Sequence, residues 1–162
     1  MIQRLQSLLF LLAAVLMISL FYFKIASFTN EGSTVNLDLC YVKGEDAFQQ
    51  VPSIGFVTYA PYIVLGLAIL LIVTIFMYAN RKRQILLANV CFIINLGYLA
   101  LTLMAPDQLK EKLMATTGNT GEWEQHIGPG SIIPIISIAL IIMATRFIKK
   151  DEALVKAADR LR

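Results

Sequence analysis

The sequence predicts an all-α integral membrane protein: a four-transmembrane-helix bundle with a small β-hairpin in the first outer loop and a helical extension at the C-terminus. The first observation is composition, since 57% of the 162 residues are hydrophobic where soluble chains are roughly 45–50% apolar. The second is that four long runs contain no Asp, Glu, Lys or Arg: 5–23, 57–80, 84–106 and 127–145. At this length the chain is expected to form one domain, 1–162.

Each run has about the 20 residues that an α-helix needs to cross a bilayer core of about 30 Å. Helices are expected because the hydrocarbon offers the backbone no hydrogen-bond partner. The alternative for 5–23 is a cleaved signal peptide. This run is longer than the usual apolar region of about 7–15 residues and no clear small-x-small cleavage site follows it. We therefore expect an uncleaved anchor.

Cations indicate which side each connector occupies, because Lys and Arg resist translocation and gather on cytoplasmic flanks. With the connector between the second and third runs inside, ten of the 14 Lys and Arg residues lie inside. Both termini are then cytoplasmic, with a tail at 146–162 and outer loops at 24–56 and 107–126. The topology signals next to the runs are Arg4, Arg81, Lys82, Arg83, Arg146, Lys149 and Lys150. The alternative for the 81–83 cluster is a contact with anionic lipid or a partner.

The outer loops carry short structural signals. In "STVNLDLCYV" polar and apolar residues alternate, which favours a strand. The side chains expected on its one apolar side are Val35, Leu37, Leu39 and Tyr41. A turn at "KGED", 43–46, before "AFQQV" would complete a hairpin. In the second loop, Pro106 can start a short surface helix over "DQLKEKLM", and the Gly-rich 116–130 segment is expected to be a mobile loop.

Few groups in the outer loops suggest chemistry. Glu122, Glu124 and His126 alternate and could meet a metal on a strand. One imidazole and two mobile carboxylates make a weak site, because catalytic zinc usually takes three protein ligands plus an open position. A solvated rim is the favoured interpretation, with Trp123 as an interfacial anchor that is half exposed to water. Cys40 in the exported loop and Cys91 in the third run are expected to be too far apart to bridge.

A polar stripe runs along the third span. Its members are Cys91, Asn95, Tyr98 and Thr102. Their spacings of 4, 3 and 4 place them on one helix face, which should face other helices rather than lipid. Interhelical hydrogen bonding is the favoured interpretation, and a solute path is the alternative.

The tail "RFIKKDEALVKAADRLR" predicts a cytoplasmic helix with one apolar face, because it is rich in helix-forming residues. Apolar residues recur at Phe147, Leu154, Ala158 and Leu161. This helix could lie on the membrane surface, pack under the bundle, or enter the groove of a partner. Leu154, Ala158 and Leu161 are the candidate partner-binding residues.

The start "MIQRLQSLLFLLA", the "NRKRQ" connector and the tail together resemble the family catalogued as domain of unknown function 4293. The resemblance covers the whole chain in order and spacing. It implies a small four-helix protein of the inner, cytoplasmic membrane of Bacteroidota, a Gram-negative group, so the outer loops would be periplasmic. It implies no activity, substrate or site residue.

The functional hypothesis is therefore a non-enzymatic accessory or scaffold subunit of an inner-membrane assembly. Its expected partners are the lipid bilayer and a membrane protein bound through the C-terminal helix; the small net charge of +3 does not suggest nucleic acid. No catalytic residue, metal or cofactor is expected. One alternative is a small channel or carrier for an uncharged solute, using the polar stripe. The other is a membrane-bound enzyme that uses Glu122, Glu124 and His126.

Overall fold

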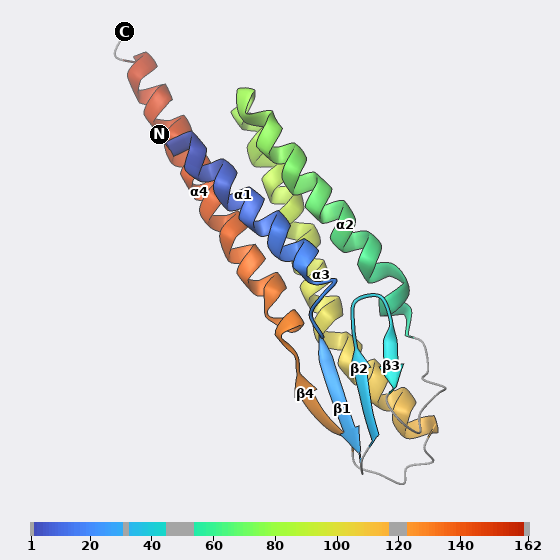
Figure 1. The fold of residues 1–162 in the computed structure, drawn as a ribbon. Coiled ribbons are helices and arrows are strands. Elements are labelled where there is room, and N and C mark those ends of the chain that lie inside the picture. Colours follow the sequence, from blue (N-terminus) through green and yellow to red (C-terminus); the bar gives the residue numbers. More distant parts are fainter. Residues whose placement is uncertain (1, 31–32, 45–53, 117–122, 161–162) are drawn as a thin grey trace.

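A computed structural model describes residues 2–30, 33–44, 54–116 and 123–160. These residues form four α-helices that run up and down beside one another, with a small sheet at one end and both chain ends at the other (Figure 1). The helices are α1 (Ile2–Ser19), α2 (Gly55–Phe76), α3 (Arg81–Thr116) and α4 (Ile133–Arg160). Short 3-10 turns, η1 (Met77–Ala79) and η2 (Pro129–Ser131), precede α3 and α4.

Three of these helices contain segments long and apolar enough to cross a membrane. The segments are Gly55–Phe76, Arg81–Ala115 and Pro129–Leu154, while Leu5–Ser19 is a shorter apolar helix. The first predicted span thus ends four residues early. A turn follows at Leu20–Tyr22, where the Tyr22 amide donates to the Ser19 carbonyl at 2.9 Å, and the chain then continues into a strand that begins at Ala26 (Figure 1).

The sheet has four antiparallel strands in the order β3-β2-β1-β4. They are β1 (Ala26–Asn30), β2 (Ser33–Leu37), β3 (Val42–Gly44) and β4 (Glu124–Ile127). The expected strand exists as β2, with Val35 and Leu37 buried. The expected turn at 43–46 is wrong for Lys43 and Gly44, which lie in β3; residues 45–53 lie outside the described part of the chain.

The chain turns earlier than the alternating pattern indicated, between β2 and β3. The Asp38 amide donates to the Tyr41 carbonyl at 3.0 Å and closes this turn. Tyr41 is therefore exposed and does not continue the buried side of the strand. The nearby Asp38 carboxylate raises the pKa of Tyr41 above its ordinary value, because its negative charge disfavours the phenolate.

Strands β1 and β4 were not predicted, and the expected loop at 116–130 is wrong for residues 124–127. Those residues pair with Ala26–Thr29, which lie about a hundred positions earlier in the chain. All four side chains of β4 are exposed, so its sequence carries no hydrophobic alternation. Trp123, directly before β4, is only 2% exposed and belongs to the core. The expectation of a half-exposed anchor is wrong because the pairing of β4 draws this indole inward.

Helix α3 continues through Pro106 to Thr116, so the separate surface helix expected after that proline is wrong. Ala105, Leu109 and Leu113 recur every four residues and are buried. The end of α3 passes behind the sheet (Figure 1), and its buried residues share one core with Phe28 of β1. Burial of this face outweighs the hydrogen bond that proline removes, about 3 kcal/mol.

Two backbone segments meet where the bundle joins the sheet. The Gly128 amide donates to the Ile25 carbonyl at 2.8 Å, and the Gly130 amide donates to the Lys24 carbonyl at 2.9 Å. The Ser131 hydroxyl adds a bond to the Ile25 carbonyl at 2.7 Å. A Cβ at Gly130 would lie 2.8 Å from the Lys24 oxygen, and one at Gly128 would lie closer still. We call this contact between 24–25 and 128–131 the junction.

The close approach at the junction predicts that adding one methyl group lowers the stability of the protein at Gly128 but not at a glycine with free space around it. Gly128→Ala should destabilise the protein by about 1–3 kcal/mol, because a backbone carbonyl must move aside. Gly97→Ala is the matched control: a Cβ there meets nothing within 4 Å on α3, and alanine is favoured over glycine in a helix by up to about 1 kcal/mol. Unfolding in detergent micelles measures both. Equal stability of the two variants would contradict the close approach.

Candidate functional site

The polar stripe of α3 lies inside the bundle. Cys91, Asn95 and Thr102 are 0% exposed and Tyr98 is 1% exposed. The neighbouring positions Ile93, Leu96, Leu101 and Leu103 are exposed. One face of α3 therefore presents polar groups to the other helices, and the opposite face presents hydrocarbon to the surroundings.

The stripe contacts both neighbours of α3. Asn95 donates its amide to the Ser137 hydroxyl of α4 at 3.0 Å. Tyr98 stacks on Phe56 of α2, with ring centroids 6.3 Å apart and planes inclined by 29°. The Cys91 sulfur lies 4.0 Å from the Thr74 hydroxyl of α2. These contacts give the stripe a role in holding α2, α3 and α4 together.

Two polar atoms of the stripe have no hydrogen-bond partner among the described residues. They are the side-chain oxygen of Asn95 and the hydroxyl of Tyr98. The Thr102 hydroxyl, by contrast, donates to the Tyr98 carbonyl one turn earlier at 2.9 Å. The stripe is thus linked to the other helices by a few separate contacts rather than by a fully paired network.

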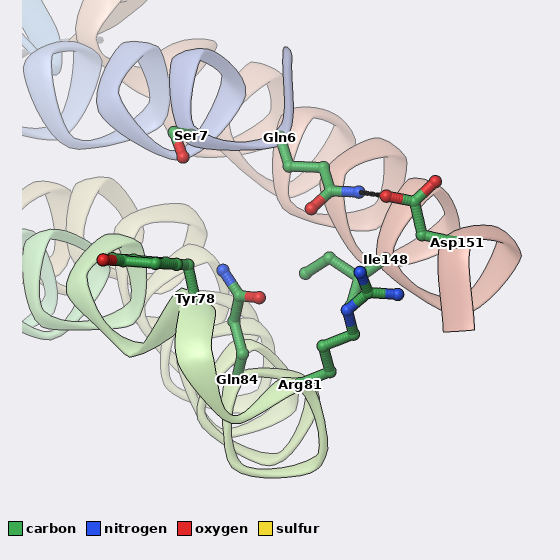
Figure 2. A pocket seen from close by; sticks show the side chains of 7 residues that line it. All are labelled: Gln6, Ser7, Tyr78, Arg81, Gln84, Ile148 and Asp151. Atoms are coloured by element: carbon green, nitrogen blue, oxygen red, sulfur yellow. Dashed lines mark hydrogen bonds between the residues drawn. The ribbon is translucent and has the colours of Figure 1, made fainter. Parts of the chain in front are cut away.

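A second polar cluster lies at the opposite end from the sheet, where α1, η1, α3 and α4 converge. It lines a cavity of about 320 Å³, which we call the end cavity (Figure 2). Its lining side chains are Gln6 and Ser7 of α1, Tyr78 of η1, Arg81 and Gln84 of α3, and Ile148 and Asp151 of α4.

Two glutamines fix the walls of the end cavity. Gln6, 5% exposed, donates to one carboxylate oxygen of Asp151 at 3.1 Å and so joins the start of α1 to α4. Gln84, 3% exposed, donates to the Thr74 carbonyl in the last turn of α2 at 3.2 Å. The carbonyls of a helix end lack partners within the helix, so Gln84 caps α2.

The three cations of the 81–83 cluster occupy different surroundings. Lys82 and Arg83 are exposed, while Arg81 is partly buried. Figure 2 shows the Arg81 side chain rising from the start of α3 toward Ile148 and the Gln6–Asp151 pair. Its Nη1 is buried and has no hydrogen-bond partner among the described residues. Arg81 therefore differs from its neighbours, although the sequence pattern treats all three as one topology signal.

The other topology signals lie at the same end of the bundle. Arg146, Lys149 and Lys150 of α4 are exposed. Arg146 and Lys149 border a groove of about 220 Å³ between α3 and α4, whose apolar side includes Phe92 and Ile142. Arg4 lies in α1, but the structure does not describe its side chain.

The tail is a direct continuation of α4, which extends past the start of α1 (Figure 1). The buried face of α4 runs through Ile141, Ala144 and Ile148. Leu154 lies off that face and is 56% exposed. Ala158 is in the helix, but the structure does not describe its side chain. Leu161 lies outside the described residues.

The structure brings together only some of the loop residues that were candidates for metal binding. His126 and Glu124 lie on β4 with Nε2 and Oε2 3.9 Å apart, and both are largely exposed. Glu122 lies outside the described residues. Within the described part of the chain, no group of three His, Cys, Asp or Glu residues could hold a metal. Cys40 is exposed, Cys91 is buried, and both are free, as the sequence indicated.

Of the residues that line the end cavity, the sequence analysis identified only Arg81, and it missed the three whose hydrogen bonds fix the walls: Gln6, Gln84 and Asp151. Gln6 and Gln84 carried a usable signal, because each is an amide at the edge of an apolar run and a buried amide needs a partner. Asp151 carried none, since it lies among the charges of an apparently solvated tail.

Comparison with known proteins gives one result. The model of a family described as Domain of unknown function (DUF4293) matches residues 2–161. A comparison with curated proteins returned no match.

The bond between Asn95 and Ser137 predicts a measurable coupling between α3 and α4. A double-mutant cycle of Asn95→Ala and Ser137→Ala should give about 0.6–1.7 kcal/mol, as for other hydrogen bonds between membrane helices. The same cycle with Thr102→Val in place of Asn95→Ala is the control, because Thr102 bonds within its own helix, and should give close to zero. Unfolding in mixed micelles measures both. Equal couplings would show that the Asn95–Ser137 bond has no specific role.

Proposed function

The chain belongs to the DUF4293 family, and we propose that it is a four-span protein of a Gram-negative inner membrane that serves as a non-enzymatic accessory or scaffold subunit. Three long apolar helices already indicate a membrane protein. The further parts of the proposal are the fourth span, the orientation and the role.

The outer face of α1 supports its assignment as the fourth span. Leu8 is 62% exposed, Leu12 47% and Val15 54%, so this helix is as apolar on the outside as its neighbours. Its 18 residues extend about 27 Å at 1.5 Å per residue, close to the bilayer core of about 30 Å. Exposed Phe21, Tyr22 and Phe23 follow it, and aromatic residues favour the membrane interface.

The distribution of cations supports an orientation with both termini in the cytoplasm. The end of the bundle that holds both termini also holds Arg81–Arg83 and the basic residues of α4 (Figure 1). Cytoplasmic flanks are the ones enriched in such residues. The sheet would then lie in the periplasm.

One observation carries the proposed role: α4 continues as a helix to Arg160, past the start of α1 (Figure 1), and Leu154 on this helix is exposed. A projecting helix with an apolar side chain and flanking charges suits the groove of a protein partner. Such an element serves binding rather than catalysis, which favours an accessory subunit.

The hydrogen bonds of the polar stripe weigh against the carrier alternative. Asn95 donates to Ser137 and Thr102 donates to its own helix, which occupies the Asn95 amide donor and the Thr102 hydroxyl that a solute path would present. Both residues are 0% exposed, and neither lines the end cavity or the groove between α3 and α4. For the enzyme alternative, Glu124 and His126 are well exposed to solvent, whereas active sites bury most of the substrate surface.

Cysteine labelling tests the membrane topology. In cells with a permeabilised outer membrane, a membrane-impermeant maleimide should label exposed Cys40. In a Cys40→Ser background, Arg83→Cys should react only after the inner membrane is opened. Buried Cys91 is the internal control that stays unlabelled in both. Labelling of Cys40 and Arg83→Cys from the same side would contradict the four-span topology.

The partner role is tested by truncating the exposed leucine of the tail. Leu154→Ala should lower recovery of a cross-linked membrane partner about fivefold or more, because removal of an anchor side chain costs above ~1 kcal/mol. Leu86→Ala is the matched control, since Leu86 is similarly exposed, 62% against 56%, but faces outward from α3. Quantitative mass spectrometry of purified complexes measures the difference. Identical sets of proteins from both variants would overturn the role assigned to the tail.

A further inference from the structure

The end cavity contains a charged hydrogen-bond donor, the guanidinium of Arg81, that needs an acceptor. The Arg81 Nη1 is shielded from solvent and has no hydrogen-bond partner among the described residues. A guanidinium is always protonated and presents several N–H donors in a fixed plane, which matches the oxygens of a phosphate. Burial of such a donor without an acceptor is unfavourable, so the geometry favours an anionic group beside Arg81.

The cavity also presents a carboxylate. Asp151 lines it from α4, and Gln6 occupies one of its two oxygens. Within the described part of the chain, Arg81 and Asp151 form no ion pair with each other. Figure 2 shows the Gln6–Asp151 pair on one wall and Arg81 reaching toward it from another. The cavity therefore holds one positive and one negative group that remain separate.

We propose that the end cavity binds a zwitterionic phosphoethanolamine group, with its phosphate against Arg81 and its ammonium against Asp151. A ligand that carries only negative charge would satisfy Arg81 but be repelled by Asp151. A ligand with an ammonium a few atoms from its phosphate satisfies both groups. The volume of about 320 Å³ lies within the range of small-ligand sites, roughly 300–1,000 Å³.

The surroundings suit a headgroup at a membrane surface. The cavity lies at the end of the bundle away from the sheet, and exposed Tyr78 and the apolar side chain of Ile148 form part of its walls. An aminophospholipid headgroup is the source we expect, because lipid headgroups lie at that level of a spanning helix bundle. This source rests on the proposed membrane insertion, whereas recognition of the phosphoethanolamine group does not.

The experiment titrates the full chain in lipid-free detergent with three probes. They are dioctanoyl phosphatidylethanolamine, dioctanoyl phosphatidylglycerol, and water-soluble O-phosphoethanolamine. Native mass spectrometry or fluorescence gives each Kd. The ethanolamine lipid should bind about tenfold or more tightly than the glycerol lipid, because each unpaired charge at a buried site is worth at least such a factor.

Substitutions test whether Arg81 and Asp151 each bind the part of the ligand proposed for them. Arg81→Gln should weaken binding of the ethanolamine lipid about tenfold or more, and Arg81→Lys should recover part of the loss because it keeps the charge without the planar donors. Asp151→Asn should bring the two lipids within about threefold of each other. Arg83→Gln, which removes a neighbouring exposed cation, should change neither Kd more than about twofold. Circular dichroism and thermal unfolding verify that each variant is folded.

The probes also separate the two sources of the ligand. Binding of the lipid well above that of O-phosphoethanolamine supports a membrane lipid, and equal binding supports a soluble phosphoethanolamine. The latter would hold even if cysteine labelling disproved the proposed topology. Absence of binding by both, equal effects of Arg81→Gln and Arg83→Gln, or an unchanged preference in Asp151→Asn would each overturn the proposal.

Discussion

The backbone contact at the junction holds the helix bundle and the sheet together. Amides and a hydroxyl from 128–131 bind the carbonyls of Lys24 and Ile25, and two glycines allow these backbone segments to approach closely enough for this. The contact sets the pairing of β1 with β4 on one side. On the other side it places the end of α1 next to the start of α4, and Gln6 and Asp151 meet near the opposite ends of these two helices.

Polar groups in this protein are concentrated at three levels of an otherwise apolar bundle. The junction binds backbone to backbone, the stripe of α3 binds α4 through Asn95, and Gln84 caps the end of α2. Each arrangement follows the same requirement, because a buried polar group is costly unless it is hydrogen-bonded. The Asn95 side-chain oxygen, the Tyr98 hydroxyl and the Arg81 Nη1 depart from this rule among the described residues. Of these three groups Arg81 is the charged one, which is why the end cavity stands out as a site for a ligand.

The outer surface of the bundle and the tail indicate what this protein contacts. Exposed leucine, isoleucine and valine side chains cover all four helices, and a surface of this kind is stable in lipid rather than in water. Helix α4 continues past the start of α1 (Figure 1), and Leu154 on it is exposed. An apolar bundle, a small sheet at one end and a projecting helix at the other are features that suit the proposed role of a subunit held within a larger membrane assembly.

Local patterns were enough to predict the helical segments and strand β2, because continuous apolar runs and two-residue alternation are local signals. The positions of β4, Trp123 and the end of α3 depend instead on contacts between distant parts of the chain. The side chains of β4 are all exposed, and its partner β1 lies about a hundred residues away in the chain. The Gln6–Asp151 bond joins residues 145 positions apart. Backbone pairing and contacts over such separations do not alter the local hydropathy pattern, so they can be identified only in the folded structure.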